Sequence, residues 1–178
     1  MDTVLSSPIR TRFAPSPSGR MHLGNVFSFL VCWLYARKNG GSIVLRIEDL
    51  DPDRSKPEYA EQLIRDLNAL ALSYDEGPIY QSKRANIYTE YYHMLADKNL
   101  IYPCFCSRAD LLSASAPHAS DGRTVYSGKC RHLTPLQIQG LIQTKKPAMR
   151  VYVPDKELFF TDLVYGPQRE NLATDCGD

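Results

Sequence analysis

The stretch Pro15-Ser-Pro-Ser-Gly19, followed by His22-Leu-Gly24, has the residue types of a loop that binds phosphate. Without a Cβ, Gly19 and Gly24 would let a planar base or a phosphate approach the backbone closely. A helix beginning near His22 would direct free N–H groups and the positive end of its dipole toward an anion. His22 could donate a hydrogen bond to a phosphate oxygen as charge develops during nucleotidyl transfer. By themselves these residues also suit a tight connection in which His22 only caps a helix.

A second group of residues, Arg46-Ile-Glu-Asp-Leu-Asp51, follows a short β-branched run. If that run is a strand of a parallel sheet, its carboxyl end is where such sheets bind ligands, and Glu48 there could bind a cationic group. The alternative is a solvated acidic turn ahead of a helix that starts at Pro57. The residues alone leave these two interpretations about even. We assign no protein ligand to Mg²⁺, because in nucleotide enzymes phosphates and water largely hold it.

A third group consists of cysteines: three of the five lie within one 27-residue stretch, at Cys104, Cys106 and Cys130. Thiolates in tetrahedral geometry favour zinc, and a closed structural site needs a fourth ligand. The nearby candidates are His118, Tyr126 and His132. Since histidine is a common zinc ligand, chemistry alone favours one of the two histidines. The alternative is three free cysteines that serve as small hydrophobic residues.

The elements that must position these groups follow from hydrophobic periodicity. Ile9–Ala14 is a predicted strand, and Ser42–Ile47 is a second one. Between them, apolar residues recur at spacings of three and four, which predicts a helix from His22 to Asn39-Gly-Gly41 with this face buried. The apolar positions are Leu23, Val26, Phe27, Leu30, Val31, Leu34 and Tyr35. Strand, helix and strand in this order predict a parallel sheet, and the whole arrangement favours phosphate binding over a simple connection.

The remainder of the chain is less regular. Ile101 to Arg131 breaks the periodic pattern and is interpreted as an inserted subdomain, and the tail from Asp162 is polar and turn-rich and ends without a closing element. Helices are predicted at Pro57–Leu72, Ser82–Lys98 and Pro135–Gln143, and an edge strand at Ala148–Val153.

Composition sets further bounds on the function. With 21 Lys plus Arg against 20 Asp plus Glu, bulk charge gives no support to a general nucleic-acid binder. The chain has no apolar run of membrane-spanning length and no secretory signal, so a cytoplasmic protein is expected. An odd number of cysteines without such a signal also argues against a disulfide framework, and Cys32 and Cys176 receive no functional role.

The stretch Arg12-Phe-Ala-Pro-Ser-Pro-Ser-Gly-Arg-Met-His-Leu-Gly-Asn25 resembles the opening of glutamyl-tRNA synthetases and their relatives, which are class I aminoacyl-tRNA synthetases. His22-Leu-Gly-Asn25 is similar to their HIGH element, with Asn25 in place of the second histidine, as is common in the glutamate branch. The resemblance implies catalytic roles for His22, Gly24 and Asn25. It also implies that Pro15, His22 and Gly24 bind ATP.

The resemblance extends to Arg46–Asp51, which is similar to an Arg-Ile-Glu-Asp-x-Asp stretch of synthetases for glutamate. It implies that Glu48 receives the substrate's α-ammonium group. Arg12 would then pair with the side-chain carboxylate through a two-pronged guanidinium contact. Ala14 and Ser16 would complete the glutamate pocket.

The cysteine stretch resembles a shortened subgroup, the glutamyl-queuosine tRNA(Asp) synthetases, which bind zinc through Cys-x-Cys and then Tyr-x-x-x-Cys. These enzymes attach glutamate to the queuosine base of tRNA(Asp). The resemblance implies one structural Zn²⁺ on four ligands, with His132 in reserve for the tyrosine, although the loop Ser107–Val125 is longer than usual for the subgroup. The implied ligands are Cys104, Cys106, Tyr126 and Cys130.

Taken together, the resemblance implies an α/β fold of the class I synthetase type: a Rossmann-like parallel sheet with a small inserted zinc-binding subdomain. We divide the chain into 1–100, the N-terminal half of the nucleotide-binding fold; 101–133, the inserted zinc-binding segment; and 134–178, the remainder of the insertion and the approach to a second half. The implied substrates are glutamate, ATP with Mg²⁺, and tRNA(Asp), and a monomer is expected.

The implied reaction is attack of the glutamate carboxylate on the α-phosphorus of ATP, which gives glutamyl-adenylate, followed by transfer to tRNA. Family members continue with a second half of the fold and a lysine-bearing KMSKS-type loop that these 178 residues lack, so a truncated and poorly active chain is expected. The alternatives are a fragment of an ordinary glutamyl-tRNA synthetase and a non-catalytic, zinc-containing RNA-binding module.

Overall fold

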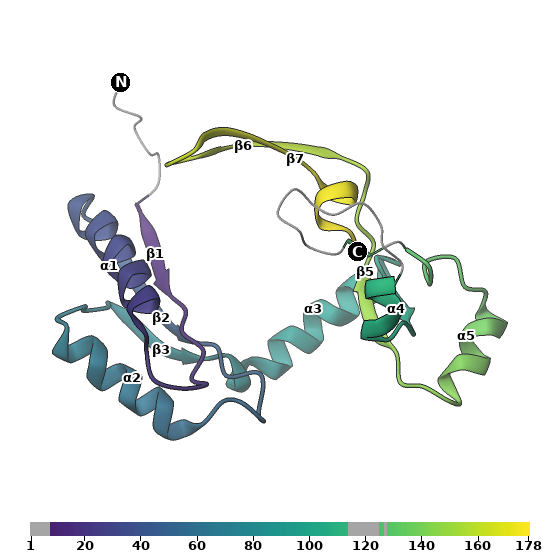
Figure 1. Cartoon of the computed structure of the whole chain (residues 1–178), viewed down its shortest axis with the longest axis horizontal. Helices are drawn as coiled ribbons and strands as arrows, with labels where there is room; N and C mark the ends of the chain where they lie inside the picture. Colours follow the sequence, from purple (N-terminus) through teal and green to yellow (C-terminus); the bar gives the residue numbers. More distant parts are fainter. Residues whose placement is uncertain (1–7, 114–124, 127) are drawn as a thin grey trace. The chain divides into compact units, whose positions relative to one another are not determined.

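The computed structural model describes residues 8–113, 125–126 and 128–178, so His118 lies outside the described residues. The chain divides into two compact units between Thr89 and Glu90 (Figure 1). The first unit carries two of the regions in which the sequence predicts chemistry, the loop around His22 and the stretch Arg46–Asp51, and the second unit carries the cysteine group. They are described separately below.

The first unit is built on a parallel three-stranded sheet in the order β1-β2-β3, with β1 at Arg10–Phe13, β2 at Ser42–Ile47 and β3 at Glu76–Tyr80. Helix α1 (Leu23–Lys38) connects β1 to β2, and α2 (Pro57–Ala69) lies between β2 and β3. The βαβ arrangement predicted from the sequence is therefore confirmed, and the observed bounds of β2 match the predicted ones. In such a sheet the loops after β1 and β2 leave the same edge, which brings the two predicted site regions together.

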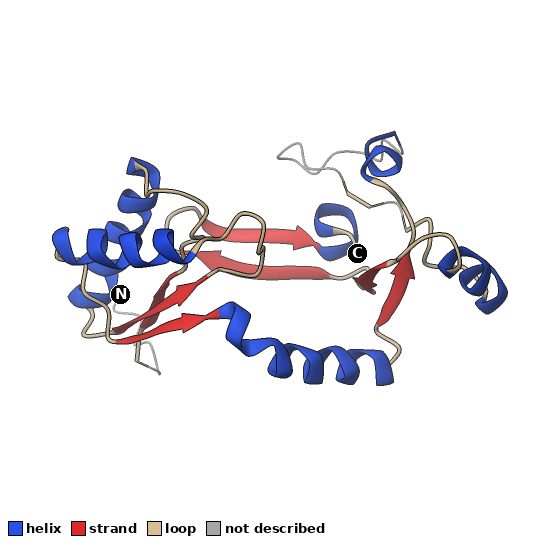
Figure 2. Ribbon diagram, turned by 90° about the horizontal axis from the view of Figure 1, so that it is seen from below, coloured by secondary structure: helices blue, strands red, loops and turns tan. Residues whose placement is uncertain are grey.

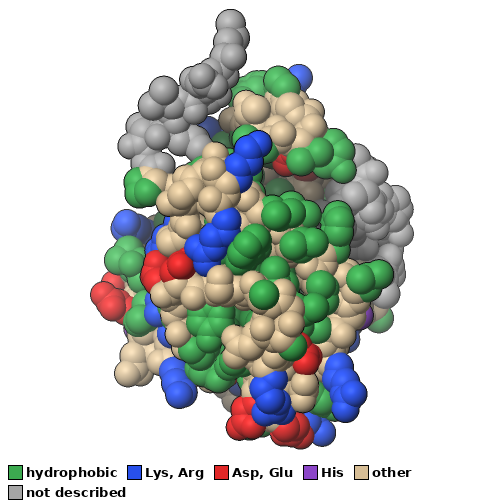
Figure 3. Space-filling model, turned by 90° about the vertical axis from the view of Figure 1, so that its left-hand side faces the viewer, with side chains coloured by type: hydrophobic (Ala, Val, Ile, Leu, Met, Phe, Trp, Pro, Cys, Tyr) green, Lys and Arg blue, Asp and Glu red, His purple; other side chains and the backbone are tan. Residues whose placement is uncertain are grey.

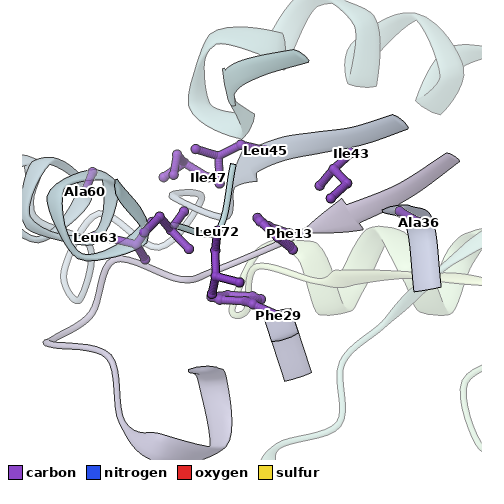
Figure 4. Packing of buried hydrophobic residues seen from close by; sticks show 10 residues of the cluster. Phe13, Phe29, Ala36, Ile43, Leu45, Ile47, Ala60, Leu63 and Leu72 are labelled. Atoms are coloured by element: carbon purple, nitrogen blue, oxygen red, sulfur yellow. The ribbon is translucent and has the colours of Figure 1, made fainter. Parts of the chain in front are cut away.

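The core of this unit lies on one face of the sheet. Successive side chains of β2 point to opposite faces of the sheet, so Ile43, Leu45 and Ile47 share one face. All three are fully buried on the side that receives α1 and α2 (Figure 4). Each such aliphatic side chain contributes about 1.5–3 kcal/mol when it leaves water. The other members of the cluster are Phe13, Phe29, Ala36, Ala60, Leu63, Leu67 and Leu72. The loops that follow β1 and β2 are thus anchored to a well-packed apolar framework.

Helix α1 buries a different face from the predicted one. Phe29 and Ala36 are buried, and Cys32 packs against the core. Most of the predicted stripe is exposed instead, with Leu23 at 82% and Phe27 at 66% of full exposure, while Val26 and Tyr35 are partly buried. The helix is apolar on nearly all sides, so periodicity could not select one face. Hydrophobic side chains also gather on the surface seen in Figure 3.

Strand β3 was not predicted, because Gly77-Pro78 reads as a turn. Its place at the edge of the sheet explains how the proline is tolerated. Gly77 has a φ of +102°, and a Cβ there would lie 2.4 Å from the Leu45 carbonyl oxygen, so only glycine suits this close approach. The strand continues into a short 3₁₀ turn, η1 (Gln81–Arg84), and then helix α3 (Ala85–Asp97).

The second unit contains two antiparallel pairs. Strand β4 (Ile101–Cys104) pairs with β5 (Ala148–Val151), and β6 (Glu157–Asp162) pairs with β7 (Gly166–Asn171) (Figure 2). Its helices are α4 (Arg108–Ser113), α5 (Pro135–Ile142) and η2 (Leu172–Cys176). None of the helices in the part of the chain that the structure describes has the length and apolar character needed to cross a membrane.

The polar, turn-rich tail after Asp162 contains a strand that the sequence analysis did not predict, β7, which completes the β6–β7 hairpin. The Asp162 carboxylate accepts hydrogen bonds from the backbone N–H groups of Val164 and Tyr165 at 2.7 and 2.8 Å. Gly166 then takes a φ of +75°. The residues that read as a loop are therefore the turn of a hairpin.

Candidate functional site

His22 caps the N-terminus of α1. Its Nδ1 accepts a hydrogen bond from the Gly24 backbone N–H at 3.1 Å, and the Asn25 side-chain oxygen accepts one from the His22 N–H at 3.1 Å. In a neutral imidazole with Nδ1 as acceptor, the proton is on Nε2. Capping therefore does not compete with the predicted chemistry, because it fixes a tautomer in which Nε2–H is a donor.

The structure gives a steric reason for a glycine at position 24, which the sequence analysis did not identify. A Cβ at this position would lie 3.0 Å from Cε1 and 3.1 Å from Nδ1 of His22. The absence of a side chain therefore leaves room for the imidazole ring. Around Gly19, by contrast, a Cβ would meet nothing within 4 Å.

An open pocket of roughly 600 Å³ lies at the loop between β1 and α1. Its lining includes most residues that the sequence predicts for glutamate and ATP, together with Arg20, Met21 and Phe29. The predicted residues in the lining are Arg12, Ala14, Pro15, Ser16, His22 and Asn25. The structure thus brings side chains from the strand, the loop and the helix start to one cavity, while their individual roles stay predictions.

Glu48 follows β2 and is tied to the same loop, since its backbone N–H donates to the Pro15 carbonyl at 2.9 Å. Its carboxylate is held from two sides, by Nε of Arg46 at 2.6 Å and by Nε2 of Gln81 at 2.9 Å. Asp49 beside it accepts hydrogen bonds from the N–H and hydroxyl of Ser82. This acidic turn is therefore fixed in position rather than freely solvated.

Gln81 was missed by sequence reasoning. Its side chain is only 7% exposed, and it is the buried polar residue that orients Glu48. A buried amide needs hydrogen-bond partners, and the Glu48 carboxylate supplies one of them. The available signal was its position directly after a strand of the parallel sheet, but that strand was itself not recognised.

In the second unit, the sulfur atoms of Cys104, Cys106 and Cys130 all lie within 4.8 Å of one another. The Tyr126 hydroxyl lies beside them, 3.4 Å from Cys104 Sγ and 3.9 Å from Cys106 Sγ. It also accepts a hydrogen bond from the Cys130 backbone N–H at 2.8 Å. The four predicted zinc ligands are therefore brought together.

The spacing suits a tetrahedral zinc ion. Zn–S bonds of about 2.3 Å place two sulfur atoms of a tetrahedron about 3.8 Å apart, and Cys106 Sγ and Cys130 Sγ are separated by 3.7 Å. His132, the reserve ligand, is exposed and does not belong to this cluster. Among the described candidates, geometry favours Tyr126 as the fourth ligand.

The protonation of the cluster follows from its surroundings. Burial alone would raise the pKa of Cys104, but hydrogen bonds from Tyr126, the Cys106 backbone and Arg150 outweigh it and lower this pKa to about 7. Burial and the hydrogen bond with Cys130 raise the pKa of Cys106 to about 11. Burial and the hydrogen bond with Cys104 also raise the pKa of Tyr126. A metal ion must displace protons here, so its binding should strengthen as pH rises.

Comparison with known proteins relates this arrangement to a family. The profile described as "tRNA synthetases class I (E and Q), catalytic domain" matches residues 8–172. The chain belongs to this family. The predicted class I fold is confirmed by a crystal structure of a glutamate tRNA ligase from Elizabethkingia meningosepticum in complex with its amino acid, with a TM-score of 0.73 and 27% identity over 94% of this chain and 37% of that one.

Three similar curated relatives are two glutamyl-Q tRNA(Asp) synthetases and one glutamate–tRNA ligase. The glutamyl-Q tRNA(Asp) synthetase of Symbiobacterium thermophilum is 47% identical over 89% of this chain and 52% of its own length. The enzyme of the same name from Nitratidesulfovibrio vulgaris is 42% identical over 96% of this chain and 56% of its own. The glutamate–tRNA ligase of Aquifex aeolicus is 46% identical over 97% of this chain and 37% of its own. The chain therefore spans about half the length, or less, of these relatives.

Proposed function

We propose that this chain supplies the ATP- and glutamate-binding half of an enzyme that activates glutamate and transfers it to the queuosine base of tRNA(Asp). The observation that carries the proposal is the single pocket that joins Arg12, His22 and the loop between them, with Glu48 tied to that loop. Arg12 and His22 line this cavity, and Glu48, which is not in its lining, supplies a carboxylate directly beyond the loop that its backbone is bonded to; a cation, a hydrogen-bond donor and an anion match an amino acid and a triphosphate.

Each side chain has a separate task in this proposal. Arg12 pairs with the side-chain carboxylate of glutamate, and Glu48 receives its α-ammonium group. The α-carboxylate then attacks the α-phosphorus of ATP, a P–O bond forms, and pyrophosphate leaves with the electrons of the broken bond. The Nε2–H of His22 donates to a phosphate oxygen as negative charge develops there. Mg²⁺ arrives with ATP and is held largely by phosphates and water.

The cysteine cluster supports the queuosine-directed subgroup over an ordinary glutamate–tRNA ligase. Cys104, Cys106, Cys130 and Tyr126 form a compact set of ligands whose spacing suits zinc. In this proposal the ion is structural. Two similar relatives at 47% and 42% identity carry the name glutamyl-Q tRNA(Asp) synthetase, which supports the same choice.

The test is glutamate-dependent exchange of pyrophosphate into ATP. It would be measured for this chain and for a chimera that joins it to the C-terminal half of the Symbiobacterium relative. We expect rapid exchange in the chimera without added tRNA, and slow exchange in this chain alone, because the chain spans only about half the length of its relatives. A chimera without glutamate-dependent exchange would instead support the non-catalytic, zinc-containing RNA-binding module.

Transfer distinguishes the two enzyme candidates. The active chimera should charge tRNA(Asp) that contains queuosine and leave the unmodified tRNA(Asp) uncharged. Charging of tRNA(Glu) at its terminal ribose would assign the chain to the ordinary glutamate–tRNA ligases.

A further inference from the structure

Arg150 on β5 lies against the cysteine cluster, although no pattern in the sequence predicted a role for it. Its guanidinium carbon lies 3.9 Å from the centroid of the Tyr126 ring, so the planar group stacks on the ring face. Cations attract aromatic rings when they lie within about 6 Å of the ring centroid, and the Arg150 guanidinium is well inside that limit. Arg150 therefore bears directly on the side chain whose hydroxyl lies beside the sulfur atoms.

Arg150 is itself held in place from outside the cluster. Its Nη1 donates to the Asp178 carbonyl oxygen at 2.5 Å, and Arg150 as a whole is only half-exposed. The Asp178 carboxylate, 2% exposed, is in turn fixed by Tyr102 and by the Val153 N–H at 2.8 Å. The guanidinium is thus presented to Tyr126 by a buried hydrogen-bond network.

One polar atom of Arg150 has no partner. The Nε–H group is buried and donates to no acceptor among the described residues. Burial of an unpaired donor is costly unless a nearby negative charge compensates it. Three thiolates around one Zn²⁺ would leave such an excess of negative charge next to this cation.

We propose that Arg150 is a positioning residue for the metal centre. Its planar guanidinium fixes the Tyr126 ring so that the hydroxyl lies among the sulfur atoms, and its positive charge offsets the excess negative charge of the thiolate ligands. The inference rests on the zinc site of the proposed function. It adds an outer partner that the four ligands alone do not include, and such partners orient metal ligands.

The experiment measures Zn²⁺ affinity of the 178-residue protein by competition with a chromophoric chelator. Arg150→Met removes both charge and stacking, and we expect affinity to fall about 10- to 100-fold, the usual cost of losing such a partner. Arg150→Lys keeps the charge without the flat group and should lose less affinity. The visible spectrum of the Co²⁺-loaded protein reports the ligand geometry and should change in Arg150→Met.

Arg131→Met is the matched control. Arg131 follows Cys130 and binds Asp178 as well, but its guanidinium lies over Tyr152, 5.5 Å from that ring's centroid, and not over Tyr126. Arg131 carries the same charge and belongs to the same network, but it does not stack on Tyr126. Replacing Arg131 should therefore reduce Zn²⁺ affinity less than replacing Arg150. In a Tyr126→Phe background the effect of Arg150→Met should shrink, because no hydroxyl remains to be positioned.

The outcomes separate the two proposals. A wild-type chain that binds no Zn²⁺ would overturn the zinc site and this inference with it. If Arg150→Met binds Zn²⁺ as tightly as the wild type does, the inference about Arg150 is overturned while the zinc site stands. Equal losses in Arg131→Met and Arg150→Met, with equal losses of metal-free thermal stability, would mean that the network only maintains the fold and would also overturn it.

Discussion

The two units position their candidate sites by different physical means. In the first, ten buried residues from the sheet, α1, α2 and the loop after α2 form one apolar cluster, and backbone hydrogen bonds join the pocket loop to Glu48 and Lys56 beside it. In the second, the buried cluster consists of Tyr102, Cys104 and Cys130, and two of these three are proposed zinc ligands. The first site therefore lies beside a separate apolar core, whereas proposed zinc ligands make up two of the three residues in the buried cluster that the structure describes in the second unit.

This difference predicts different sources of stability. Burial of apolar surface stabilises the first unit without any ligand. Small domains with little apolar core commonly depend on a metal or on disulfides, and the described cysteines of this chain are free. The second unit should therefore depend on zinc, while the first should not.

The largest effect is expected from Cys130→Ser. Structural zinc sites provide about 10–16 kcal/mol of apparent binding free energy, so loss of one buried ligand should remove the metal and much of the second unit's stability. Amide hydrogen exchange of the zinc-loaded chain should show lost protection in β4 and β5 and unchanged protection in β1 and β2. Chelation of the wild type should give the same pattern.

Cys176→Ser is the control for that prediction, because Cys176 is exposed and lies outside the cluster. It should leave zinc content and protection unchanged. Equal loss of protection in both units on chelation would contradict the contrast drawn here.

The converse change is Leu45→Ala in the first unit. Leu45 is fully buried on β2, and removing such a side chain costs about 2–5 kcal/mol through lost burial and the cavity left behind. Urea denaturation should show this loss of unfolding free energy, and amide hydrogen exchange should assign it to β1 and β2. The zinc content should be unaffected. Leu30→Ala, at a site 41% exposed on α1, should cost much less. A similar cost for both would show that the apolar cluster is not what supports this unit.

His22 separates capping from chemistry within the first site. His22→Asn keeps a side chain that caps helices well, whereas His22→Ala loses the cap at a cost of about 1 kcal/mol. Both variants lose the Nε2–H donor, so both should slow pyrophosphate exchange of the chimera by about 10²- to 10³-fold, as loss of one such donor does elsewhere. If His22→Asn exchanges pyrophosphate at the wild-type rate, the role of His22 is capping alone.

The sequence predicted what depends on local pattern. β2, α1, α2 and α5 were recognised from periodicity and caps, and the residues of the pocket loop were found because strand, loop and helix follow one another directly. The four zinc ligands were also close in sequence. The resemblance to synthetases then supplied roles that spacing alone leaves open.

What the sequence did not predict depends on tertiary contacts. The exposed face of α1 could not be chosen, since the helix is apolar on nearly all sides. Gln81 and Arg150 reach Glu48 and Tyr126 across 33 and 24 positions of the chain, so no local pattern marks them. β3 and the β6–β7 hairpin were missed because their Gly, Pro and Asp residues resemble those of loops.

The smallest predicted effect tests the polar periphery of the first unit. Arg37 donates to both carboxylate oxygens of Asp75 at 2.8 and 3.1 Å, and the Ile43 N–H donates to the same carboxylate at 2.7 Å. These hydrogen bonds, that from Arg37 first, lower the pKa of Asp75. Because the pKa is lower in the folded state, this group stabilises the fold above its unfolded pKa of about 3.9, and the contribution disappears as pH falls through the folded value.

Asp75→Asn should therefore destabilise the first unit near pH 7 and have no such effect at pH values below the folded pKa. Asp75 is 42% exposed, so solvent screening keeps the expected difference on the order of 0.5 kcal/mol. Denaturation midpoints of both proteins across this pH range would measure it. A constant difference at every pH would mean that the substitution acts through packing, and a loss comparable to that of Leu45→Ala would contradict the dominance of the apolar core in this unit.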